Sequence, residues 1–439
     1  MNRILFLLLA MVLNSSIFAQ MKKIEFVEYT LDNGLHVILH QDKSVPIVCV
    51  SVMYHVGSKN ENPARTGFAH FFEHLLFEGS ENIKRGEFDK YISNAGGTNN
   101  ANTWYDRTYY YELLPSNYVS TGLWLESERM LHAKVDSVGI ETQRQVVKEE
   151  RRQRVDNQPY GSVLEEAMKR AYTTHPYQWS VIGSMDHLDA AEEADYVNFY
   201  KEFYVPNNAI LSIAGDIDIE ATKLEIQKYF GNIPRGKEPF RPTLVEPALL
   251  AEKRDTIYDN IQLPGVIQTY RIPAQGTDDF YAVSMLSTLL SQGESSRLSR
   301  ALVDEQELAL QIFNIPLALE DPGVSLNFGI CNMGVKPEVL EAAMDKEVEK
   351  VQNELIGEME FQKLRNQVEA DFITANTSVA GIAESLANYK MYYGDTNLIN
   401  TEIERYMNVT REDIQRVAKK YYNKNNRVVL YYLPKQQQP

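Results

Sequence analysis

Short apolar segments separated by turn residues predict a β-sheet in the first third of the chain. The expected strands cover residues 25–31, 35–40, 47–55, 98–103 and 108–114. Asp32, Asn33 and Gly34 separate the first two strands and are typical of a hairpin turn. A turn around Tyr105 and Asp106 joins the last two strands. These connections favour a largely antiparallel sheet.

Helical segments surround and follow these strands. We expect them at residues 66–79, 87–94, 118–134, 139–155 and 192–203. The first opens at Thr66-Gly67 and closes at Gly79, and the second stops at Gly96-Gly97. Strands and helices do not alternate as they do in βαβ units, so the predicted fold class is α+β.

The second half of the chain repeats a pattern of the first. Residues 203–211 and 421–429 both contain a helix end, an Asn-Asn turn and an apolar strand, 218 positions apart. Residues 233–255 between the halves are rich in proline and mixed charge, as linkers are. We therefore predict two similar domains, at residues 21–232 and 256–439, joined by a linker at 233–255.

The N-terminus has the layout of a secretory signal peptide at residues 1–20. Arg3 is followed by an apolar run over residues 4–13 and by small residues that end in Ala19-Gln20. The apolar run is short for a membrane span. We expect an exported protein, periplasmic or secreted, without a stable membrane anchor after cleavage.

The charge balance excludes some classes of partner. Without residues 1–20 the chain has 43 basic and 60 acidic residues, a formal net charge of −17. Such a protein is poorly suited to binding nucleic acid or anionic membrane surfaces. Cys49 and Cys331 lie in separate apolar segments and are expected to be buried core residues, not a disulfide.

The most specific chemical signal is the segment His70-Phe71-Phe72-Glu73-His74. Two histidines four residues apart on a helix project from the same face and share one metal ion. Glu73 lies between them and reaches a water held by that metal. The arrangement is the zinc helix of a metallopeptidase with the position of the glutamate inverted, H-x-x-E-H.

The corresponding helix in the second half lacks these groups. Residues 283–293 match residues 69–79, with Ser284, Ser287 and Thr288 in the places of His70, Glu73 and His74. All eight histidines lie in the first half. The second domain is therefore predicted to be a metal-free repeat.

A hydrolytic zinc site needs a third protein ligand, and residues 139–155 offer Glu149 and Glu150. On a helical wheel, Val146 and Val147 centre an apolar stripe about 50° from Val146. Glu150 falls within the stripe at about 40°, whereas Glu149 falls outside it at about −60°. A carboxylate on an apolar face needs a cation, so Glu150 is the better ligand. The alternative is an ion pair with a base such as Arg170. Gln143 also faces inward and is expected to orient a group around the metal.

These segments together resemble the insulinase/pitrilysin family of zinc peptidases, which includes the mitochondrial processing peptidases. The resemblance covers nearly the whole mature chain. It rests on residues 54–58, 66–74, 79–80, 96–97, 100–103, Glu150, 207–208 and 215–216. The chain departs from the family's pattern at one position: seven residues before the last ligand the family often has glutamate, and this chain has Gln143. The 75 residues between His74 and Glu150 match the spacing of the family.

The resemblance implies one Zn²⁺ per chain, bound by His70, His74 and Glu150, with Glu73 as the general base. It implies a pair of α+β domains that form half of a clamshell. The substrate is then a peptide that adds to the strand containing Thr98, Asn99, Asn100, Ala101 and Asn102. The facing half is a second copy, in a homodimer, or a catalytically inactive paralogue, in a heterodimer.

The predicted function is hydrolysis of peptides or unfolded polypeptides by an exported zinc endopeptidase. Two alternatives stay open at this point. One is a specific processing peptidase with the same chemistry. The other is a non-catalytic scaffold subunit of the same family, although scaffold subunits are expected to lose the ligands that this chain retains.

Overall fold

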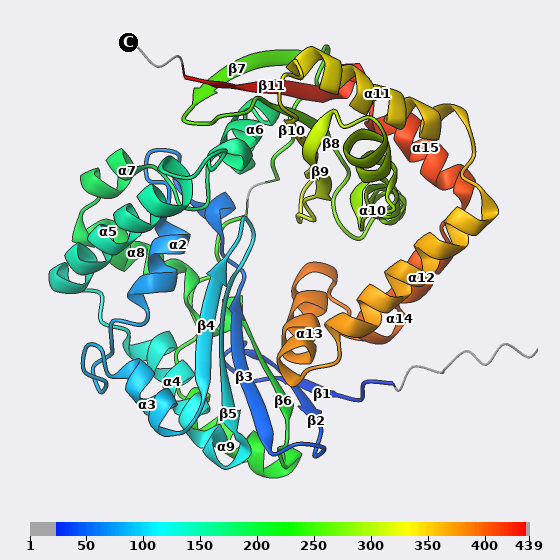
Figure 1. The fold of residues 1–439 in the computed structure, drawn as a ribbon. Coiled ribbons are helices and arrows are strands. Elements are labelled where there is room, and N and C mark those ends of the chain that lie inside the picture. The colour runs from blue at the N-terminus through cyan, green and yellow to red at the C-terminus, as the bar shows by residue number, and fades with distance from the viewer. Residues whose placement is uncertain (1–22, 242, 436–439) are drawn as a thin grey trace, which may run out of the picture.

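Two β-sheets flanked by helices make up the protein (Figure 1). The structure is a computed structural model, and it describes residues 23–241 and 243–435. The predicted signal peptide at residues 1–20 lies outside these ranges. Within them, no helix is long and apolar enough to cross a membrane.

The first sheet has six strands in the order β1-β2-β6-β3-β5-β4. Its central strand β3 is buried over nearly its whole length because helices cover both faces of the sheet. All neighbouring pairs are antiparallel except β2 and β6. The strands are β1 (Val27–Thr30), β2 (His36–Gln41), β3 (Ile47–Tyr54), β4 (Thr98–Thr103), β5 (Thr108–Pro115) and β6 (Ala209–Gly215).

Most helices of the first half cover one face of this sheet. The α-helices are α2 (Phe68–Leu75), α3 (Phe88–Asn94), α4 (Val119–His132), α5 (Ser137–Arg151), α6 (Val163–Ala171), α7 (Met185–Ala190), α8 (Glu193–Phe203) and α9 (Ile219–Phe230). Short helical turns are η1 (Ser58–Asn60), η2 (Ser116–Tyr118), η3 (Arg152–Asp156), η4 (Pro176–Gln178) and η5 (Pro206–Asn208).

The second sheet repeats the topology of the first. Its order, β7-β11-β8-β10-β9, matches β2-β6-β3-β5-β4, and in each sheet one pair of neighbours is parallel. The strands are β7 (Lys253–Asp259), β8 (Gly265–Arg271), β9 (Ala309–Pro316), β10 (Val324–Cys331) and β11 (Arg427–Pro434). The helices are α10 (Asp278–Ser291), η6 (Ser299–Glu305), α11 (Pro337–Asn353), α12 (Glu358–Ala375), α13 (Val379–Tyr393), α14 (Leu398–Met407), α15 (Arg411–Tyr421) and η7 (Lys424–Asn426).

Each half contributes one helix to the sheet of the other. Helix α13 of the second half buries Ile382, Ala383 and Leu386 against β2, β3 and β6 of the first sheet. Helix α6 of the first half buries Ala167 and Met168 against β8, β10 and β11 of the second sheet. The two helices begin 216 positions apart and therefore occupy equivalent places in the repeat. Figure 1 shows α13 beside the first sheet and α6 beside the second sheet.

Several boundaries differ from the sequence prediction. The helix with the two histidines ends at Leu75, and a turn carries the chain from there to Gly79. The helix expected to run to residue 155 ends at Arg151 and continues as η3. Strand β7 begins at Lys253, inside the segment assigned to the linker. The domain limits themselves remain a prediction.

Candidate metal centre

Helix α2 has one aromatic face and one polar face. Phe68, Phe71 and Phe72 stack against aromatic rings of α8, among them Tyr196 and Phe199. The Tyr110 hydroxyl of β5 also donates to the Phe72 carbonyl oxygen at 3.0 Å. This packing fixes the rotation of α2. The polar face, with its two histidines, is therefore left to face the neighbouring helix α5.

Asp136 caps the start of helix α5, since its side chain accepts a hydrogen bond from the Gly139 amide at 2.8 Å. Ile140 and Val147 are buried, but Val146 is 43% exposed, so the apolar stripe is centred on Val147 and not between the two valines. This correction leaves the choice between the glutamates unchanged. Glu150 is half-buried on the inner side of the helix, and Glu149 is exposed.

The side chains of His70, His74 and Glu150 converge, as expected from the sequence. Their potential ligand atoms lie within 4.8 Å of one another. Glu150 Oε2 is 3.0 Å from His74 Nε2 and 3.5 Å from His70 Nε2. Two imidazole nitrogens and one carboxylate oxygen are a donor set that zinc prefers, with a fourth position left for water. The residues present therefore fit a zinc ion.

The electrostatics of these groups favour a bound cation. Burial lowers the pKa of His70 to about 4, and His74 adds to this effect. The His70 ring is thus neutral at physiological pH, which is the form that binds metal. Burial acts to raise the pKa of Glu150, but the histidines and Arg154 outweigh it, so the net shift is downward and the group is ionised.

Glu73 lies between the two histidines in the sequence and faces strand β4. Burial raises its pKa, while the Thr103 hydroxyl and His74 oppose the rise. A carboxylate with a raised pKa beside a metal site is suited to accepting a proton from water. The sequence analysis had given no role to Thr103, the last residue of β4.

The predicted substrate strand lies at the edge of its sheet. Among the described strands, β4 pairs only with β5, so its other edge has no partner strand. Asn100 and Asn102 are exposed on β4, whereas the Asn99 side chain donates to Asp89 at 2.9 Å. Asn99 therefore has a structural partner on α3. Helix α2 packs beside β4, which places this edge next to the candidate metal centre.

Gln143 faces inward, but its hydrogen bond does not go to a candidate ligand. Its Nε2 atom donates to Glu78 Oε1 at 2.5 Å, and Glu78 is buried and also paired with Arg85. The expectation that Gln143 orients a group around the metal therefore stays a prediction. Glu78 gives a physical reason for glutamine here, because a glutamate at 143 would bring two buried carboxylates together.

Arg154 is a neighbour of the site that the sequence analysis missed. Its guanidinium contacts Glu150 Oε1 at 2.6 Å, while Oε2 faces the two histidines. The sequence does indicate this pair, because Arg154 follows Glu150 by four residues, which is the spacing of ion pairs on a helix. Five basic residues lie from position 144 to position 154, however, and spacing alone does not show which of them pairs with Glu150.

The second half has no such cluster among its described residues. In place of Glu73, Ser287 donates to the Asn314 carbonyl oxygen at 3.0 Å, and in place of His74, Thr288 donates to the Ser284 carbonyl oxygen at 3.2 Å. These hydroxyls are thus used within the fold. The second domain retains the helix and fills its polar face with local hydrogen bonds.

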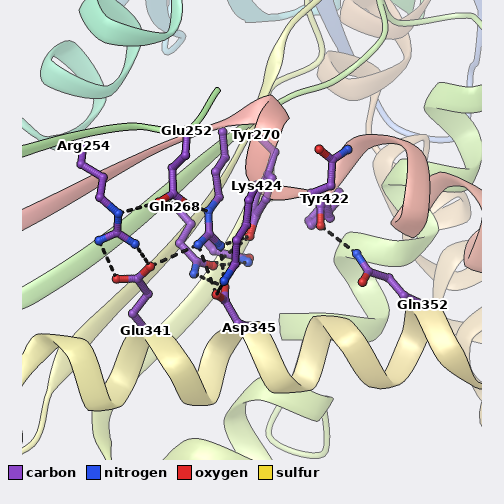
Figure 2. A network of polar contacts seen from close by, with 12 residues as sticks. Glu252, Arg254, Gln268, Tyr270, Glu341, Asp345, Gln352, Tyr422 and Lys424 are labelled. Atoms are coloured by element: carbon purple, nitrogen blue, oxygen red, sulfur yellow. Dashed lines mark hydrogen bonds and ion pairs between the residues drawn. The ribbon is translucent and has the colours of Figure 1, made fainter. Parts of the chain in front are cut away.

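A large polar network does lie between α11 and the second sheet (Figure 2). It pairs the acids Glu252, Glu341 and Asp345 with Arg254 and the buried Arg427. Gln268 and Tyr270 bond to members of the same network. Because the acids are matched by bases, the network is a structural connection between helix and sheet and not a second metal centre.

Comparison with known proteins gives the family. The model described as "Insulinase (Peptidase family M16)" matches residues 36–184, and the model described as "Peptidase M16 inactive domain" matches residues 192–368. The chain is 32% identical over 430 residues to the zinc protease PqqE of Helicobacter pylori, covering 97% of both chains. The chain belongs to the insulinase family of peptidases. An uncharacterized zinc protease of Mycobacterium leprae is 26% identical over 406 residues, covering 90% of this M16 chain and 89% of that protein.

Solved structures show the same fold for this M16 chain. The crystal structure of a protease from Helicobacter pylori matches with a TM-score of 0.89 and 31% identity, over 94% of this chain and 100% of that chain. The periplasmic protease PqqL from Escherichia coli matches with a TM-score of 0.76 and 18% identity, over 94% of this chain but 48% of that chain. The two-domain α+β prediction is therefore confirmed.

The adjacent glutamates provide a matched pair of variants for the ligand assignment. We expect Glu150→Gln to weaken zinc binding by more than the roughly 10–100-fold cost of losing a group that only supports a ligand. Glu149→Gln makes the same chemical change on the exposed side of the helix and should leave zinc affinity unchanged. Competition with a chelator of known affinity measures both. A larger effect of Glu149→Gln would contradict the assignment.

The contact between Gln143 and Glu78 predicts a cost for restoring glutamate at 143. Gln143→Glu should lower the free energy of unfolding by about 1–3 kcal/mol, because a buried acceptor loses its donor. Gln145→Glu is the control, since Gln145 donates to Glu141 at 2.8 Å on the exposed side of the same helix. Urea denaturation measures both, together with the double variant Glu78→Gln/Gln143→Glu, which should regain part of the loss. Equal stability of the two single variants would contradict the account.

Proposed function

We propose that the protein is an exported zinc-dependent endopeptidase that cleaves peptides or unfolded polypeptides. One observation carries the proposal. The ligand atoms of His70, His74 and Glu150 lie within 4.8 Å of one another on helices α2 and α5, and α2 packs beside the edge strand β4. The names of the similar zinc proteases support the metal and the reaction class.

The residues of the site have distinct parts in the proposed reaction. His70, His74 and Glu150 would hold a zinc ion, which would supply a Lewis acid for the scissile carbonyl and lower the pKa of a bound water. Glu73 accepts a proton from the attacking water and donates it to the leaving amine. Burial of Glu73 matters for both transfers, because its raised pKa lies closer to the working pH than that of an exposed glutamate.

The substrate is proposed to bind as an added strand along β4. The unpaired backbone groups of residues 98–102 would bond to an extended peptide, and the exposed Asn100 and Asn102 would contact its side chains. Backbone hydrogen bonds carry little sequence information. We therefore propose broad sequence specificity, with selection by the extended conformation of the substrate.

Two alternative functions are distinguished by particular observations. The match to the inactive-domain model would favour a scaffold role if it covered the metal centre, but it covers residues 192–368 and leaves His70, His74 and Glu150 outside. A ferredoxin protease, FusC, crystallised with ferredoxin from Arabidopsis, shares the fold with a TM-score of 0.71 at 19% identity, over 95% of this chain and 49% of that chain. That complex favours a specific processing peptidase as the second candidate function.

The proposal is tested by replacing the general base. Glu73→Gln retains a polar side chain of the same length but cannot accept a proton. We expect hydrolysis of a quenched peptide library to fall at least ~10²-fold, with one zinc per chain retained. The control is Glu81→Gln, since Glu81 is exposed and forms an ion pair with His132, away from the candidate ligands. Normal turnover in a zinc-loaded Glu73→Gln protein would refute the role of Glu73 as general base. A wild-type protein that binds no zinc would refute the proposed function.

We further propose that two chains enclose the site. The chain covers 93% of the first half of PqqL but 48% of the complete protein, so it corresponds to one of two halves. A facing half would exclude water from the metal centre and limit access to the β4 edge. The facing half is a second copy or a catalytically inactive paralogue.

The assembly proposal predicts that activity depends on protein concentration. Dilution below the dissociation constant of the dimer should lower activity per chain, and sedimentation should show the loss of the dimer over the same range. Activity restored only by adding a different chain would support the heterodimer. Full activity per chain in a monomeric species would contradict enclosure by two chains.

A further inference from the structure

A buried glutamate outside the candidate metal centre is attached to the start of the helix that contains two of its ligands. Glu61 is 5% exposed. Its Oε1 accepts a hydrogen bond from the Ala69 amide at 2.8 Å, and its Oε2 accepts one from the Gly67 amide at 2.8 Å. Both carboxylate oxygens are thus occupied by backbone donors at the first turn of α2, next to His70.

Helix α2 has no cap of its own at this end. Gly67 occupies the capping position with a φ of 94°, a left-handed conformation, and it has no side chain to accept from the first turn. The first turn also lacks an acidic residue. Glu61 supplies from outside the helix the acceptor that the first turn lacks and, when it is ionised, the negative charge that a helix N-terminus favours.

The segment that carries Glu61 is itself fixed in place. The Trp179 indole donates to the Ser58 carbonyl oxygen at 2.7 Å, which anchors η1 just before Glu61. The turn after it is closed by the Arg65 amide, which donates to the Asn62 carbonyl oxygen at 2.8 Å. Gly67 packs against Gly183, where an added Cβ would meet backbone atoms. The carboxylate is therefore held by a rigid loop and in turn holds α2.

We propose that Glu61 is a positioning residue of the metal centre, which sets the place of His70 and His74 by fixing the first turn of α2. The inference rests on the proposed zinc peptidase function. Zinc affinity depends on ligands that are held in place before the metal binds, because each ligand that must be ordered lowers the net binding free energy. The aromatic packing of α2 fixes its rotation, and Glu61 fixes its position along the helix axis.

The experiment compares two carboxylates that cap helices. Asp218 accepts a hydrogen bond from the Ala221 amide at 2.9 Å at the start of α9, a helix without candidate ligands. Glu61→Gln and Asp218→Asn thus each remove the charge from a helix terminus. Chelator competition gives the zinc affinity and thermal unfolding gives the stability of both. Burial raises the pKa of Glu61 to about 8 against the opposing effect of the backbone amides, so the titrations belong at pH 9, where the group is ionised.

We expect Glu61→Gln to weaken zinc binding about tenfold, the lower end of the range for groups that support metal ligands. Asp218→Asn should lower the melting temperature without changing zinc affinity. The absorption spectrum of the cobalt-loaded protein should also change in Glu61→Gln alone. Zinc affinity within twofold of wild type in a folded Glu61→Gln protein would overturn the inference.

A second variant decides the question if Glu61→Gln does not fold. Glu61→Asp retains the charge but withdraws it from the two amides, so we expect a smaller loss of zinc affinity, and an affinity equal to that of wild type would overturn the inference. A failure of the proposed function would give a different result from a failure of this inference. In that case the wild-type protein itself binds no zinc or binds it without hydrolysing peptides.

Discussion

The structure depends on the exchange of one helix between its two halves. Each sheet has an apolar face that its own helices leave uncovered, and α13 and α6 cover these faces from the opposite half. Strand β3 shows the consequence, since Val48, Val50 and Val52 contact one cluster and Cys49 and Met53 contact another on the opposite face. Burial of both faces makes the sheet a rigid support. The candidate metal centre is built on that support.

The metal centre combines one local and one distant constraint. His70 and His74 are placed by helical periodicity alone, one turn apart on α2. Glu150 arrives from a second helix, and its position depends on how α5 packs beside α2. Arg154 then occupies one oxygen of Glu150 and leaves the other facing the histidines. A half-buried carboxylate and two imidazoles form a donor set that a zinc ion would fill, with the guanidinium of Arg154 beside it.

The second half shows what the same topology does without the chemistry. Its equivalent helix, α10, uses Ser287 for a hydrogen bond to the neighbouring strand β9, and its sheet is joined to α11 through the ion pairs of Arg427. The strongest polar interactions of this half are therefore satisfied internally. In exchange it supplies α13, which supports the sheet that carries β4. The repeat serves the metal centre by packing and not by ligands.

The sequence by itself determined the features that arise from local periodicity. The hairpins and the face shared by His70 and His74 depend on residues close together in the chain, and so does the separation of Glu150 from Glu149 on one helix. The wheel nevertheless placed Val146 on the inner face, because a valine does not reveal whether a neighbouring element covers it.

Only the tertiary structure decided the contacts between distant segments. The exchange of α6 and α13 and the bond of Gln143 to Glu78 join residues through packing that no local pattern records. A repeat predicts that two halves share a topology, but it does not predict which half covers a given face. That choice depends on the free energy of burying apolar surface over the whole chain, which is a property of the assembled fold.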